Sequence, residues 1–81
     1  MPIVFFLEGL KFFFFSNEGN PREPLHIHVR KDSSLAKFWL YPSVQLVDSY
    51  GFSAKELNKM AKIIDNRKVE IEDAWNEHFG A

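Results

Sequence analysis

The sequence has 81 residues, no cysteine and a net charge of −1, and nine of its aromatic residues are Phe. This length predicts one domain, residues 1–81, that buries one modest core. The lack of cysteine excludes disulfide bonds and thiolate metal sites, and the near-neutral charge excludes a polycation that binds nucleic acid over its whole surface.

The first apolar stretch, residues 1–15, is interrupted by Glu8 and Lys11. It has no basic leader and no uninterrupted run of about 18 apolar residues, so it predicts neither a signal peptide nor a membrane helix. We therefore expect a cytoplasmic protein without membrane contact. Within this stretch, two β-prone runs flank Glu8-Gly9, which is typical of a two-residue hairpin turn.

Residues 17–24 contain two prolines, a glycine and two asparagines, which predicts a loop. A second hairpin is expected next, in which LHIHV (25–29) and LAKFWL (35–40) flank the polar segment RKDSS (30–34). Pro42 interrupts the following segment, so only a short edge strand or extended stretch is expected at residues 44–47.

Two features predict C-terminal helices. Ser53 and Glu56 form the S-x-x-E pattern of a capping box, and Phe52 and Leu57 are placed for a hydrophobic staple. Apolar residues then recur at nearly helical spacing as far as Phe79. One straight helix over 54–79 would be about 39 Å long, whereas a compact chain of this size is about 30 Å across. A kink or break is therefore expected in DNRK, residues 65–68.

The expected fold class is α+β: an antiparallel sheet of four to five strands, built from two hairpins, followed by one kinked helix or two C-terminal helices. Alternation along the third and fourth strands separates small apolar residues from polar and aromatic ones. If the apolar residues face the core, the opposite face collects His26, His28, Arg30, Lys37, Trp39 and Tyr41. The phenylalanines of residues 12–15 point to both faces, so the helices or another chain must cover part of the second face.

This polar face has three interpretations. In a metal-independent ribonuclease, His26 and His28 would be acid and base, since the pKa of histidine lies near neutrality. Arg30 and Lys37 would then bind phosphate and Trp39 would stack a base. As a metal site, the H-x-H pair would need a third ligand such as Glu18 or Glu23. Because no recognisable ligand spacing follows, we expect no metal and no cofactor. The third interpretation is a solvated sheet surface without function.

Several motifs together resemble the small bacterial proteins of the domain of unknown function 4160 family. They are an aromatic strand ending in S-N-E, then H-I-H-V, A-K-F-W-L, G-F-S-x-x-E-L and a terminal W-N-E-H-F. The resemblance covers nearly the whole chain, although the loop G-N-P-R-E-P-L is longer than the family pattern by a few residues. It implies a component of a toxin–antitoxin-like two-gene module.

The sequence thus predicts a component of such a module that acts on or binds RNA through the His/Arg/Lys face, with enzymatic activity left open. The alternative is a non-enzymatic, antitoxin-like module that docks a partner protein through its aromatic sheet face. The expected partners are RNA, a small protein encoded nearby, or a second copy of this chain in a homo-oligomer.

Overall fold

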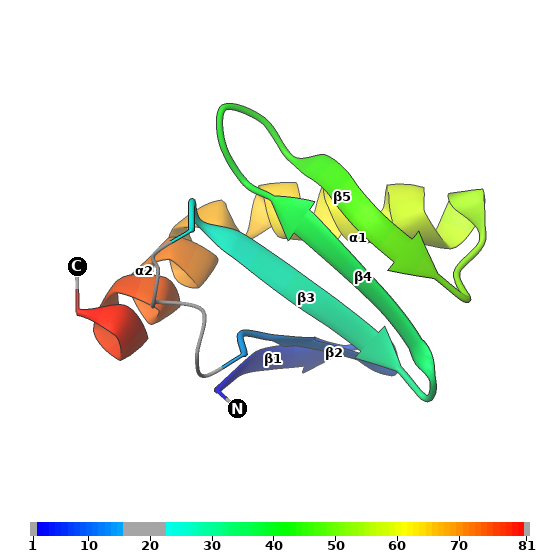
Figure 1. Cartoon of the computed structure of the whole chain (residues 1–81), viewed down its shortest axis with the longest axis horizontal. Coiled ribbons are helices and arrows are strands. Elements are labelled where there is room, and N and C mark those ends of the chain that lie inside the picture. The colour runs from blue at the N-terminus through cyan, green and yellow to red at the C-terminus, as the bar shows by residue number, and fades with distance from the viewer. Residues whose placement is uncertain (1, 16–22, 81) are drawn as a thin grey trace.

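The computed structural model describes residues 2–15 and 23–80. It contains an antiparallel sheet with the strand order β1-β2-β3-β4-β5, followed by two helices (Figure 1). The elements are β1 (Ile3–Leu7), β2 (Leu10–Phe13), β3 (His26–Lys31), β4 (Ser34–Trp39), β5 (Gln45–Tyr50), α1 (Ala54–Asn66) and α2 (Lys68–Phe79). This arrangement confirms the α+β prediction, with five strands and two helices.

Both predicted hairpins are present. Glu8 and Gly9 connect β1 to β2 with φ angles of 53° and 80°, as the favoured two-residue hairpin turns require. The second turn is confined to Asp32 and Ser33, so it is shorter than the predicted segment 30–34. The reason is that Lys31 pairs with Ser34, which extends both strands to the solvent-exposed tip of the hairpin.

The fifth strand is longer than predicted and begins later, at Gln45 instead of residue 44, and continues to Tyr50. Its pairing with β4 shifts by one residue at Val47, because Lys37 is opposite Asp48 whereas Phe38 is opposite Leu46. Such a bulge lets a strand change which residues face the core. Leu46 therefore shares the face of Phe38, while Asp48 shares the opposite face with Lys37.

The helix signals in the sequence are confirmed. The Ser53 hydroxyl accepts the Glu56 N–H at 3.1 Å, and the Glu56 carboxylate accepts the Ser53 N–H at 2.8 Å. The latter bond lowers the pKa of Glu56 below its usual value. The helices are separated at Arg67, within the predicted segment 65–68. Gly80 ends α2 in the left-handed conformation with φ 69°. No helix in the described ranges is long and apolar enough to cross a membrane.

The core lies between the two helices and one face of the sheet. Ile27 and Val29 of β3 contribute to it from the sheet, and Ile64 and Ile71 contribute from the helices. In Figure 1, α1 runs behind β4 and β5, and no described helix crosses in front of β3 and β4. Four apolar residues that alternation assigned to the core are buried there as predicted, namely Ile27, Val29, Ala36 and Phe38. The second face of the sheet is largely uncovered by helices (Figure 1), although His26 and His28 on this face are also buried.

Gly51 offers a test of the connection between β5 and α1. Its φ is +84°, and a Cβ atom here would clash with the side chain of Ser34 and lie 3.1 Å from the Ser34 Cα. Gly80 also has a positive φ but has no heavy atom within 4 Å of such a Cβ. We expect Gly51→Ala to lower the free energy of unfolding by about 1–3 kcal/mol through backbone strain alone, and by more once Ser34 has to move.

Urea denaturation of Gly51→Ala and Gly80→Ala measures this difference, because the control carries the strain without the clash. A Gly51→Ala protein as stable as Gly80→Ala would contradict the close approach of Gly51 to Ser34.

Candidate functional site

Strand pairing arranges the side chains of the uncovered sheet face in rows that run across the strands. The first row crosses all five strands and consists of Phe6, Lys11, Arg30, Leu35 and Tyr50. The second row consists of Ile3, Phe13, His28, Lys37 and Asp48. The third row crosses β3, β4 and β5 and consists of His26, Trp39 and Gln45. We call these thirteen residues the open face.

All five residues predicted for the site belong to the open face. His26 is opposite Trp39, His28 is opposite Lys37, and Arg30 follows on the same side of β3. Alternation predicted only which side chains of one strand share a face. The register between β3 and β4 places the predicted side chains of both strands next to one another on the same face.

Tyr41, in contrast, leaves the open face because the chain bends directly after Leu40. Its hydroxyl donates a hydrogen bond to the Glu72 carboxylate of α2 at 3.0 Å. This bond raises the pKa of Tyr41 above its usual value. The Lys68 ammonium lies 4.9 Å from the centre of the Tyr41 ring. The expectation that Tyr41 extends the polar face is therefore wrong, since the residue connects the bend to α2.

His26 is fully buried at the end of the sheet nearest α2. Its ring makes edge contacts with Trp39 at 5.5 Å and with Trp75 of α2 at 5.2 Å. Its Nδ1 lies 2.8 Å from the carbonyl oxygen of Pro24, and because a carbonyl only accepts, Nδ1 carries the proton. Because no part of His26 is exposed, a substrate cannot reach this imidazole without a rearrangement of its surroundings. The catalytic role of His26 stays a prediction.

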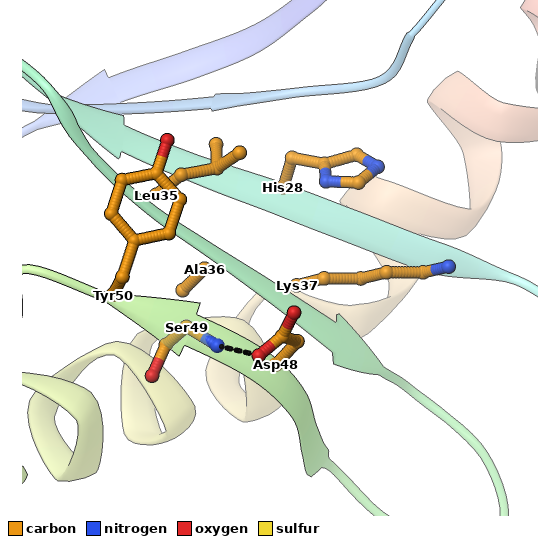
Figure 2. A pocket seen from close by; sticks show the side chains of 7 residues that line it. All are labelled: His28, Leu35, Ala36, Lys37, Asp48, Ser49 and Tyr50. Carbon is orange, nitrogen blue, oxygen red and sulfur yellow. Dashed lines mark hydrogen bonds between the residues drawn. The ribbon is translucent and has the colours of Figure 1, made fainter.

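His28 lies nearer the open surface, although only 6% of it is exposed. The centres of the Phe13 and Phe15 rings lie 5.6 Å and 4.5 Å from the centre of its imidazole. Its other side lines a shallow hollow of about 160 Å³ in the open face, together with Lys37 and Asp48 (Figure 2). His28 is thus the histidine placed beside an accessible surface, and its catalytic role also stays a prediction.

The Lys37 ammonium extends toward the start of β3. It donates to the Glu23 carboxylate at 2.9 Å and lies 4.8 Å from the centre of the Trp39 ring. Trp39 already contacts Lys37 on its ring and His26 at its edge. The aromatic side chains of the open face that are most exposed are instead Phe6, at 65%, and Tyr50, at 62%.

Two cations flank a buried aromatic ring at the centre of the open face. Lys11 of β2 is directly opposite Arg30 of β3. The Lys11 Nζ and the Arg30 Cζ lie 5.1 Å and 5.7 Å from the centre of the Phe13 ring. None of the ion pairs within residues 2–15 and 23–80 involves Arg30. The guanidinium of Arg30 is therefore the charged group at this position that can accept an anionic partner.

In the described part of the chain, no three His, Asp or Glu side chains lie close enough together to hold a metal ion. Glu18, one of the two carboxylates considered as a third ligand, lies outside the described residues, as does most of the predicted loop 17–24. Glu23 is described, and its carboxylate lies 3.8 Å from the Nδ1 of His26.

Eight of the thirteen residues of the open face were not among those predicted for the site. Four of these eight carry a charge or an exposed aromatic ring, and they are Phe6, Lys11, Asp48 and Tyr50. The positions of Phe6 and Lys11 could have been predicted from the two-residue turn at Glu8-Gly9. This turn fixes the register of β1 and β2 and so places Phe6 opposite Lys11. No comparable local signal exists for β5, since a bulge sets its register.

The fold and the open face define a small α+β protein whose five-stranded antiparallel sheet has helices on one face and a row of cations and aromatic rings on the other. The chain belongs to the family described as Domain of unknown function (DUF4160), whose model matches residues 9–76. This match confirms the resemblance seen in the sequence. Comparison with curated proteins and with solved structures gave no match.

The burial of His26 predicts a structural contribution that does not depend on catalysis. We expect His26→Ala to lower the free energy of unfolding by about 2–4 kcal/mol, because it leaves a cavity between Trp39 and Trp75 and removes a buried hydrogen bond. His78 is an exposed histidine of α2, so His78→Ala is the matched control and should change stability by less than about 0.5 kcal/mol. Equal stabilities of the two variants in chemical denaturation would contradict the packing described for His26.

Proposed function

We propose that the open face binds single-stranded RNA. The observation that carries this proposal is the first row of the sheet, in which Lys11 and Arg30 face each other beside the Phe13 ring while exposed aromatic rings end the row. The proposal concerns binding, because binding requires only the half-buried cations and the exposed rings and not the buried imidazole of His26.

The charge of the open face supports an anionic ligand. Its thirteen residues include three cations, Lys11, Arg30 and Lys37, and one carboxylate, that of Asp48, while the Glu23 carboxylate next to the face pairs with Lys37. Arg30 makes no ion pair within residues 2–15 and 23–80, so a phosphate beside it would gain a charged partner. Because binding of this kind releases counterions, affinity should fall steeply as the salt concentration rises.

The aromatic side chains support a single strand over a duplex. Phe6 and Tyr50 lie at opposite ends of a row that spans five strands, which is roughly 19 Å at the usual spacing between strands. Bases of a single strand can stack on such rings, whereas the bases of a duplex are already stacked on one another. A sheet face with cations between two exposed rings therefore fits a short unpaired segment.

Docking of a partner protein through the same face is less well supported by the geometry. The centres of protein–protein interfaces are depleted in lysine and acidic residues, yet Lys11 and Lys37 lie on the inner strands of this sheet. The exposed phenylalanine and tyrosine are at the edges instead. Cleavage of RNA by His28, and membership of a toxin–antitoxin-like pair, stay predictions that add to the proposed binding.

Removal of the central cations tests the electrostatic part of the proposal. We expect Arg30→Ala and Lys11→Ala each to weaken binding of an eight-nucleotide single-stranded RNA up to about fivefold, equivalent to 1 kcal/mol. Each variant should also reduce the slope of log affinity against log salt by about 0.7. Fluorescence anisotropy at several salt concentrations measures both quantities.

Lys62 is an exposed lysine of α1, so Lys62→Ala is the matched control and should bind like the wild type. The proposal fails if the wild type shows no salt-dependent binding, if duplex RNA binds as tightly as the single strand, or if Lys62→Ala weakens binding as much as Arg30→Ala. Equal affinity for single-stranded DNA would broaden the ligand to single-stranded nucleic acid and would contradict the choice of RNA.

Removal of the exposed rings tests the stacking part. Stacking of a base on an aromatic side chain is worth about 1–3 kcal/mol, so Tyr50→Ala and Phe6→Ala should each weaken binding by at least about fivefold without changing the salt dependence. Val69 is an exposed apolar residue of α2, and Val69→Ala controls for loss of apolar surface. Unchanged affinity in both aromatic variants would contradict a stacked ligand.

A further inference from the structure

Asp48 supplies the single carboxylate among the charged residues of the open face, and the binding of phosphates does not explain why a carboxylate is present there. Asp48 is exposed and lies directly opposite Lys37 across β4 and β5. The Lys37 ammonium nevertheless bonds to Glu23. Within residues 2–15 and 23–80, no ion pair involves Asp48. An unneutralised carboxylate repels RNA unless it makes a specific contact with hydrogen-bond donors.

The hollow beside this carboxylate has a volume of about 160 Å³, which is enough for one aromatic ring. Figure 2 shows Tyr50 and Leu35 at one end of the hollow and His28 and Lys37 at the other, with the Asp48 carboxylate beside them. Asp48 and Tyr50 are two residues apart on β5 and point to the same side, so their Cα atoms are about 6.5–7 Å apart. A base stacked on the Tyr50 ring would therefore turn its edge toward Asp48.

The carboxylate is also held in place. One of its oxygens accepts the backbone N–H of Ser49 at 2.9 Å, as Figure 2 shows by the dashed line. Each carboxylate oxygen has two acceptor sites, so both oxygens keep the capacity to accept from a ligand. An oriented, solvent-exposed carboxylate is an acceptor for two neighbouring donors.

We propose that the hollow lined by His28, Leu35, Lys37, Asp48 and Tyr50 is a recognition site for one guanine base. Guanine presents two adjacent donors, N1–H and the N2 amino group, which match the two oxygens of a carboxylate. Uracil presents one donor between two carbonyl acceptors, and adenine and cytosine each place a ring-nitrogen acceptor beside their amino group. These acceptors face the carboxylate unfavourably, so the site discriminates by repulsion as well as by attraction.

This inference rests on the proposed binding of single-stranded RNA and adds base preference to it. The test compares an octamer of uridine with octamers in which one central uridine is replaced by guanosine, adenosine, cytidine or inosine. Two good hydrogen bonds to a base edge discriminate roughly 5- to 150-fold, so the guanosine octamer should bind more tightly by a factor in that range. Inosine lacks the N2 amino group and should lose most of this advantage.

Asp48→Asn should abolish the preference for guanosine and leave the affinity for the uridine octamer equal or higher, because a negative charge is removed from the phosphate-binding face. Asp73 is an exposed aspartate of α2, so Asp73→Asn is the matched control and should keep the preference. Thermal denaturation of both variants shows whether each is folded.

The outcomes separate this inference from the proposed function. Binding of all octamers with equal affinity overturns guanine recognition and leaves RNA binding intact. A preference for guanosine that persists in folded Asp48→Asn places recognition elsewhere and also overturns it. Absence of binding to every octamer overturns the proposed function itself, and the guanine site with it.

Discussion

The pairing of β2 with β3 is the constraint on which the rest of the structure depends. These two strands are separated by a long connection, yet Phe12 lies opposite Val29 and Phe13 lies opposite His28. A slip of one residue would exchange the two faces of β2. The observed register places Phe12 in the core with the helices and Phe13 on the open face beside His28.

The same register brings Lys11 opposite Arg30, and this pair determines the electrostatic character of the open face. The Phe13 ring offsets part of the repulsion through cation–π contacts with both side chains, each worth about 0.5–1 kcal/mol near a surface. An antiparallel sheet can leave one face to solvent. Here that face carries a buried ring, two neighbouring cations and exposed rings at its edges. A sheet face that is merely solvated does not need this arrangement.

The parts of the fold that could be predicted from the sequence are those set by neighbouring residues. The capping box at Ser53 and Glu56 and the turn at Glu8-Gly9 are local hydrogen-bonding and backbone signals, and both are present. The break near Arg67 followed from length alone, since one straight helix would exceed the size of the molecule.

The remaining features depend on contacts between distant residues. The bulge at Val47 sets which residues of β5 reach the open face, and no pattern within the strand predicts it. Trp75 encloses His26 from a helix more than forty positions later in the chain. Alternation could therefore group the predicted site residues on one face, but it could not show that one histidine is buried or that Asp48 and Tyr50 complete the surface.

The most direct test of the account is an NMR titration of the isotopically labelled protein with an unstructured eight-nucleotide RNA. The account predicts chemical-shift changes that map to the strands carrying the open face, including the backbone amides of Lys11, Arg30, Asp48 and Tyr50, while the exposed face of α1 around Lys62 is unchanged. Shifts confined to the helices, or no shifts at RNA concentrations well above that of the protein, would contradict it.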